Sequence, residues 1–265
     1  MNQFERLMVK TLLFLLVAMA GPWAVTVAFA QETALTRVLF VGNSYLYYND
    51  SLHNHVERMA QERYSNTQSR DFQYKSATIG GARLKHHNLD WLLTPGQIGV
   101  DLPFQVVIMQ GGSFEPLTER TRAVFIDTTV AYARKVRQIG ATPMLYMTHA
   151  YVAPHHRVDE AMIRVVSKTY IDAGHAAQAE VIPVGLAYER SYKERPSFSL
   201  HADFDGTHPN LRGTYLGACV VFLSLFDDDE SSLSYDYFGR LPQDEALYLQ
   251  RIARETVDAF SGMSK

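Results

Sequence analysis

The 265-residue sequence contains a single cysteine, Cys219. One cysteine cannot form a disulfide within the chain, and it excludes zinc and iron–sulfur sites that are built from several cysteines. Cys219 lies in the apolar run 216–223. We therefore expect a small, buried hydrophobic side chain at this position.

The chain also lacks an excess of charge of either sign, with 25 Lys and Arg against 28 Asp and Glu. Proteins that bind nucleic acids usually carry a basic face or cluster, so nucleic acid is not an expected partner. The aromatic content of 12% and the net charge of −3 exclude a disordered chain. Without internal repeats or a low-complexity linker, the sequence fits one globular domain.

The first thirty residues differ from the rest. Arg6 and Lys10 precede an uncharged run, 11–30, that ends in Ala28-Phe29-Ala30. A basic start, an apolar middle and small residues before the cleavage point are typical of a secretory signal peptide. We predict a signal peptide over residues 1–30, cleaved after Ala30, and a secreted or periplasmic mature domain over 31–265 without stable membrane association. An uncleaved membrane anchor is the alternative, since the uncharged run is long enough to span a bilayer.

In the mature chain, short apolar runs alternate with helical patterns. Strands are predicted over 38–41, 72–78, 106–109, 143–147 and 181–182. Strands separated by helices imply right-handed crossovers and a parallel sheet that is covered on both faces. The predicted fold class is therefore α/β, a three-layer α/β/α sandwich with a five-stranded parallel sheet.

Helices are predicted between and after these strands. Asp50 or Ser51 is positioned to cap one helix, and the other helices are predicted over about 118–140, 158–179, 211–225 and 242–260. In the helix over 118–140, the spacing predicts a buried face made of Val124, Thr128, Ala131, Val136 and Ile139.

Polar and glycine-rich segments follow the predicted strands. They are Gly42-Asn43-Ser44-Tyr45, Gly80-Gly81, Gln110-Gly111-Gly112-Ser113 and Thr148-His149-Ala150-Tyr151, and a late segment reads Asp205-Gly206-Thr207-His208-Pro209. In sheets of this kind, ligands bind outside the carboxyl ends of the strands. We therefore expect the functional residues to lie in these segments.

The first and last of these segments resemble the SGNH (GDSL-type) hydrolase superfamily, in its divergent Gly-Asn-Ser branch. The block VLFVGNS at 38–44 matches the turn that carries the family's serine, and DGTH at 205–208 matches its Asp-x-x-His. The resemblance covers essentially the whole mature chain. It implies the flavodoxin-like SGNH hydrolase fold, a serine esterase activity, and no metal or organic cofactor. The α/β-hydrolases share the Ser-Asp-His order, but they require Gly-x-Ser-x-Gly, and position 46 is Leu.

The residue types fit this chemistry. A serine hydroxyl attacks an ester only when a base accepts its proton, and His208 would accept the proton of Ser44. Asp205 would hold the imidazole in the required tautomer. The resemblance implies oxyanion donors at the Ser44 backbone N–H, at Gly81 with Gly80 as the alternative, and at a side-chain amide. The family's Asn is absent, and Gln110 stands in its place as either an oxyanion donor or a structural hydrogen-bonding residue.

Other polar and aromatic residues surround the predicted serine. Thr148, His149 and Tyr151 are predicted at the mouth of the site as substrate contacts. The tyrosines at 45, 47 and 48 either stack on a sugar ring or pack against the next helix. Close histidine pairs occur at 53 and 55, 86 and 87, and 155 and 156. Because adjacent residues on a helix point apart, we expect surface histidines and no metal site.

The sequence therefore predicts a secreted serine esterase that hydrolyses short-chain esters, with acetyl esters of carbohydrates as the favoured substrates. The partner would be a small-molecule or polysaccharide ester. One alternative is a lipase or thioesterase that acts on longer acyl chains. The other is a non-catalytic glycan-binding protein with the same fold, which the missing asparagine favours.

Overall fold

The computed structural model describes residues 34–226 and 233–263, which belong to one compact unit. The predicted signal peptide, residues 1–30, lies outside the described residues. Within the described part, no helix combines the length and the apolar character that a membrane span needs.

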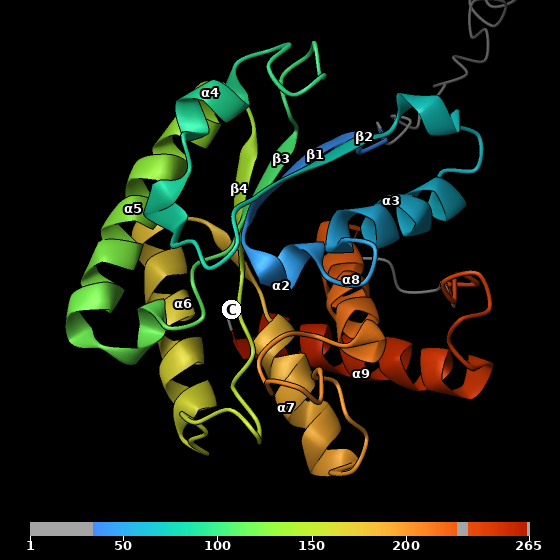
Figure 1. Ribbon diagram of the computed structural model, residues 1–265. Coiled ribbons are helices and arrows are strands. Elements are labelled where there is room, and N and C mark those ends of the chain that lie inside the picture. The colour runs from blue at the N-terminus through green and yellow to red at the C-terminus, as the bar shows by residue number, and fades with distance from the viewer. Residues whose placement is uncertain (1–33, 227–232, 264–265) are drawn as a thin grey trace, which may run out of the picture. The chain divides into compact units, whose positions relative to one another are not determined.

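The sheet has five parallel strands in the order β2-β1-β3-β4-β5 (Figure 1). Their bounds are β1 Arg37–Gly42, β2 Gln73–Thr78, β3 Val106–Met109, β4 Thr142–Tyr146 and β5 Glu180–Ile182. Each strand pairs in parallel with its neighbours, so all the carboxyl ends lie at one edge. The predicted five-stranded parallel sheet is confirmed.

Helices cover both faces of this sheet (Figure 1). They are α2 Ser44–Tyr47, α3 Leu52–Arg63, α4 Leu89–Leu93, α5 Glu119–Gln138, α6 Met162–Ala177, α7 Val184–Glu194, α8 Leu211–Phe226 and α9 Gln243–Met263. Val38 and Phe40 of β1 join the core cluster that contains α3, α8 and α9. Leu39 and Val41 join the cluster beneath α4, α5 and α6. Because both faces are buried, β1 is continuously apolar rather than alternating.

Three details of the helix prediction were wrong. The helix α7 was not expected, and α6 begins at Met162 rather than at residue 158 because an Asp159 carboxylate oxygen accepts from the Ala161 N–H in a turn. In α5, the buried face consists of Thr121, Phe125, Thr129, Ala133 and Val136, so of the five predicted residues only Val136 belongs to it. The Thr129 hydroxyl donates to the Phe125 carbonyl of its own helix, which lets a polar residue occupy the core.

Gly42 ends β1 at a point where a side chain has no room. A Cβ atom there would lie 2.4 Å from Gln110 Oε1 and 2.7 Å from Leu46 Cδ1. The close approach lets the strand of the predicted serine pack directly against the end of β3. Gly42 therefore helps to fix where Ser44 begins the helix α2.

We expect Gly42→Ala to lower the free energy of unfolding by about 1–3 kcal/mol, because the added methyl group overpacks a buried contact. Urea denaturation monitored by circular dichroism measures this change. The matched control is Gly262→Ala in α9, where the added Cβ meets no atom within 4 Å. The control should leave stability unchanged or raise it by up to about 1 kcal/mol. Equal effects of the two substitutions would contradict the packing explanation.

Candidate active site

The turn after β1 is held by the side chain of Asn43. Its Oδ1 accepts a hydrogen bond from the Tyr45 N–H at 3.1 Å, which caps the helix α2. Its Nδ2 donates to the carbonyl of Ala82 at 3.1 Å. One buried amide therefore links the loop that carries Ser44 to the loop that follows β2. No role for Asn43 was predicted from the sequence, although Asn is a common N-cap residue.

Ser44, His208 and Asp205 are joined by hydrogen bonds across the site. The Ser44 Oγ lies 2.8 Å from His208 Nε2, and His208 Nδ1 contacts Asp205 Oδ2. With its proton on Nδ1, the imidazole donates to the carboxylate and leaves Nε2 free to accept from the serine hydroxyl. The structure thus brings together the three residues that the sequence predicts as a triad, in the arrangement that a nucleophile, a base and its orienting carboxylate require.

The carboxylate of Asp205 is ionised and well supplied with donors. Its Oδ1 accepts from the backbone N–H groups of Thr207 at 3.0 Å and of His208 at 3.1 Å. Burial opposes ionisation, but the hydrogen bonds from the imidazole and these N–H groups hold the pKa of Asp205 below its usual value. An ionised Asp205 can stabilise an imidazolium at His208.

Aromatic rings lie beside the imidazole of His208. The Tyr48 ring stacks on it with centroids 4.4 Å apart, and Tyr47 stacks on Tyr48 at 5.5 Å. The Phe204 ring lies 6.4 Å from the imidazole. Tyr47 is 43% exposed and Phe204 is 70% exposed. The site therefore has an exposed aromatic border, whereas Tyr45 is buried.

The predicted oxyanion donors differ in their availability. Within the described chain, the backbone N–H groups of Ser44, Gly80 and Gly81 have no acceptor in the protein. Gly81 has φ +67°, a conformation that favours glycine. Both glycines are exposed, so these groups can donate to a bound molecule.

The predicted oxyanion role of Gln110 needs correction. Its side chain is fully buried, its Oε1 accepts from the Asn43 N–H at 3.0 Å, and its Nε2 donates to the Gly111 carbonyl. Both ends of the amide are thus occupied by the backbone, and Gln110 is the structural hydrogen-bonding residue of the two alternatives. The missing asparagine of the family has no replacement at this position.

The predicted substrate contacts also need correction. Thr148 and His149 are fully buried. Gly185 of α7 packs against the Thr148 carbonyl, and the His149 ring lies between Tyr45 and Tyr188 while its Nε2 donates to the Thr207 carbonyl. These two residues therefore support the site instead of touching substrate. Tyr151 is also largely buried, and its hydroxyl donates to Ser113 Oγ at 2.9 Å. It remains a prediction as a substrate contact.

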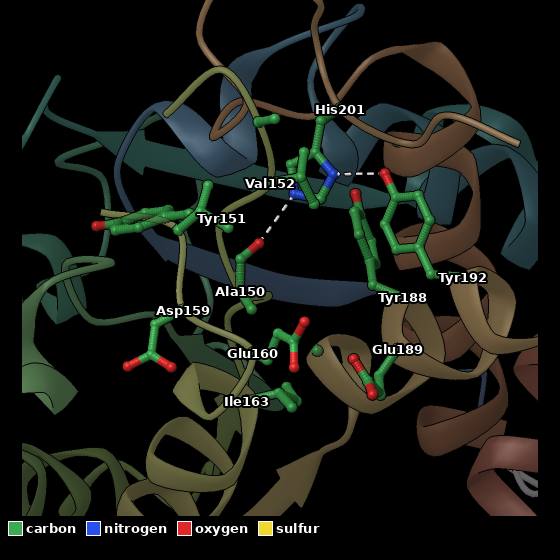
Figure 2. A pocket seen from close by; sticks show the side chains of 13 residues that line it. Ala150, Tyr151, Val152, Asp159, Glu160, Ile163, Tyr188, Glu189, Tyr192 and His201 are labelled. Atoms are coloured by element: carbon green, nitrogen blue, oxygen red, sulfur yellow. Dashed lines mark hydrogen bonds between the residues drawn. The ribbon is translucent and has the colours of Figure 1, made fainter. Parts of the chain in front are cut away.

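Residues 150–153 line one side of a hollow of about 240 Å³ (Figure 2). The side chains of Glu160, Tyr188, Glu189, Tyr192 and His201 line it, and none of the three triad residues does. The His201 ring donates through Nε2 to the Ala150 carbonyl at 3.0 Å and accepts at Nδ1 from the Tyr192 hydroxyl at 2.7 Å, as the dashed lines show. The hollow is thus separate from the serine.

Several histidines are buried, contrary to the expectation of surface positions. Of the close pairs, His55 is fully buried and His87 is 6% exposed. Within the described residues, no three His, Cys, Asp or Glu side chains gather in a way that could hold a metal ion. Burial lowers the pKa of His201 to about 4, so this ring is neutral at pH 7.

We expect acid to destabilise the protein through His201. Its folded-state pKa of about 4 lies below the unfolded value of 6.5, so the unfolded chain binds more protons as pH falls through this window. Between pH 7 and pH 5 this one residue should remove about 2 kcal/mol of stability.

Urea denaturation at the two pH values measures this loss. His201→Gln keeps an amide donor for Ala150 and does not titrate, so its loss over the same interval should be smaller by about that amount. An identical pH dependence in both proteins would rule out His201 as the cause.

Comparison with known proteins supports the fold. No protein-family model and no curated protein matches the sequence. Solved structures do match, among them a DUF4886 family protein from Bacteroides uniformis, with a TM-score of 0.62 and 15% identity over 83% of this chain and 93% of that one. A putative SGNH hydrolase from Slackia heliotrinireducens has a TM-score of 0.57 and 19% identity over 72% and 98%. An acetyl xylan esterase has a TM-score of 0.55 and 14% identity over 71% and 99%.

These neighbours share the architecture described above, while few of their residues are identical to those of this chain. The likeness therefore concerns the fold, and it agrees with the sequence motifs at Ser44 and at Asp205–His208. The described chain has the fold of the SGNH (GDSL-type) hydrolases.

Proposed function

We propose that this protein is a serine esterase that hydrolyses short-chain esters, with acetyl esters of carbohydrates as its substrates. The observation that carries the proposal is the chain of hydrogen bonds from Ser44 through His208 to Asp205. These groups lie at the carboxyl edge of a parallel sheet, where sites of this fold class form.

In the proposed reaction, His208 Nε2 accepts the Ser44 proton while the serine oxygen attacks the ester carbonyl. The tetrahedral intermediate collapses, the bond from the acyl carbon to the alcohol oxygen breaks, and His208 returns the proton to the leaving alcohol. Water then attacks the acyl-enzyme with His208 again as the base, which releases the acid and restores Ser44. Asp205 stabilises the imidazolium in both halves of the cycle.

The developing oxyanion needs donors, each of which typically lowers the barrier by roughly 3 kcal/mol. We assign this role to the backbone N–H groups of Ser44 and of Gly81, with Gly80 as the alternative. Because Gln110 bonds to the backbone, the proposed oxyanion hole consists of main-chain donors. Main-chain donors are fixed by the fold and need no side-chain ordering during the reaction.

Two observations favour a short acyl group on a sugar. Neither of the two described hollows is lined by the triad residues, so no deep acyl channel leads to the serine from them. The exposed rings of Phe204, near His208, and of Tyr47, which stacks on Tyr48, offer flat apolar surfaces at the border of the site. The acetyl xylan esterase of the comparison is named for a carbohydrate ester. A polysaccharide ester would reach such an open site.

We further propose that the protein is secreted or periplasmic, with cleavage after Ala30. The basic start and apolar run of residues 1–30 support this location. We expect mass spectrometry of the exported protein to find Gln31 as its first residue. An exported protein that keeps residue 1 would instead support the membrane anchor.

We expect the mature chain to hydrolyse p-nitrophenyl acetate, and Ser44→Ala or His208→Ala to reduce kcat by at least about 1,000-fold because nucleophile and base act as a unit. Activity should fall sharply with p-nitrophenyl octanoate. The control Thr129→Val removes a buried hydrogen bond in α5 and should keep wild-type kcat.

Other outcomes would separate the alternatives. Equal or higher activity on the octanoate ester would favour a lipase or thioesterase. If a fluorophosphonate does not label Ser44 and wild-type activity equals that of Ser44→Ala, the esterase proposal is wrong. Retained glycan binding in that case would support a non-catalytic protein.

A further inference from the structure

The loop that carries Asp205 and His208 is held at the residue between them. The Thr207 carbonyl accepts a hydrogen bond from His149 Nε2 at 2.8 Å. The Thr207 hydroxyl lies 2.5 Å from the hydroxyl of Tyr45. Both groups of one loop residue are therefore fixed, one by the end of β4 and the other by the helix that begins at Ser44.

The ring of His149 is fixed in turn by stacking. It lies between Tyr45, with centroids 4.4 Å apart and planes at 11°, and Tyr188, at 4.3 Å and 5°. His149 is fully buried, and its Nδ1 has no hydrogen-bond partner within the described structure. Burial, together with the nearby His201, lowers the pKa of His149 well below its usual value. The ring is therefore neutral, with its proton on the Nε2 that donates to Thr207.

Two further sets of contacts hold the loop 205–208 in place. The Val152 N–H donates to the Gly206 carbonyl at 2.9 Å, which ties the loop to the chain that leaves β4. The residue after His149, Ala150, is held through its carbonyl by His201, whose ring also accepts from Tyr192 (Figure 2). Residues of α7 and of the segment that follows β4 thus hold a loop that lies more than fifty residues away in sequence from His149.

We propose that His149 and Tyr45 are positioning residues that act through Thr207 to hold Asp205 and His208 against Ser44. This inference rests on the proposed function, because it concerns the same reaction. Neither side chain touches substrate. Their contribution is to prevent the loop from shifting, since a displacement of about 1 Å of a catalytic group can cost about 100-fold in rate.

The first test compares two substitutions at His149. His149→Phe keeps an aromatic ring in the stack but leaves the Thr207 carbonyl without its donor, whereas His149→Gln loses the ring and keeps an amide donor. We expect His149→Phe to lower kcat by about 10- to 100-fold with KM within about twofold of wild type. His149→Gln should recover most of that loss, to within about fivefold of wild-type kcat.

The second test uses the hydroxyl contact. Tyr45→Phe and Thr207→Val each remove it, so the double variant should lose no more kcat than the worse single variant, because interacting residues are not additive. The matched control is Tyr248→Phe, which removes a similar hydroxyl contact to Ser191 between α9 and α7. The control should keep wild-type kcat.

A measurement independent of activity completes the test. Hydrogen exchange of the segment 202–210 should be faster in His149→Phe and in Tyr45→Phe than in wild type, and unchanged in Tyr248→Phe. Thermal unfolding identifies any variant that fails to fold, and Thr207→Val is the milder substitution to use if His149→Phe does fail. If exchange is unchanged and kcat is equal in His149→Phe and wild type, the positioning proposal is wrong.

These results are distinguishable from a failure of the esterase proposal. If wild type and Ser44→Ala hydrolyse esters equally, the esterase proposal fails while faster exchange in the His149 and Tyr45 variants still supports the hold on the loop. If Ser44→Ala is inactive but the His149 and Tyr45 variants behave as wild type in both measurements, only the positioning proposal fails.

Discussion

The site depends on the buried amide of Asn43 and its neighbour Gln110. Gln110 fixes the Asn43 backbone through its side-chain oxygen, and Asn43 caps the helix of the serine while it donates to the carbonyl of Ala82. Buried polar groups are costly when unpaired, so these bonds favour one arrangement of the ends of β1, β2 and β3. The positions of Ser44 and of the glycines after β2 follow from that arrangement.

A second buried cluster, made of His149, Tyr45 and Tyr188, supports the loop of Asp205 and His208. Aromatic stacking there replaces the amide contacts, with His149 held between two tyrosine rings. The two supports meet at the helix α2, because Ser44 follows Asn43 directly and precedes Tyr45. Ser44 and His208, the proposed nucleophile and base, are thus positioned by different elements that share one short helix.

Much of this could be predicted from the sequence, since apolar runs mark strands and the Gly-Asn-Ser and Asp-Gly-Thr-His motifs are local. The burial of individual polar side chains could not be predicted. His149 follows a strand end, where exposure is ordinary, but Tyr45, Tyr188 and the Thr207 carbonyl, all distant in sequence, enclose its ring. Gln110 could not be assigned either, because its two roles differ only in where its amide points.

The helix α7 was missed although Val184, Ala187 and Ser191 are buried with helical spacing, since Gly185 and Ser191 are not typical core residues. Gly185 is required because a Cβ would lie 2.2 Å from the Thr148 carbonyl.

The exposed rings of Tyr47 and Phe204 are distinct from the buried residues that hold the loop of Asp205 and His208. Tyr47 and Phe204 border the solvent, whereas Asn43, Gln110 and His149 lie beneath the site and are almost inaccessible. For the proposed esterase, substrate preference and the alignment of the reacting groups would therefore depend on separate residues. In directed evolution of such an enzyme, the outer aromatics could change to accommodate new alcohols while the alignment beneath them is preserved.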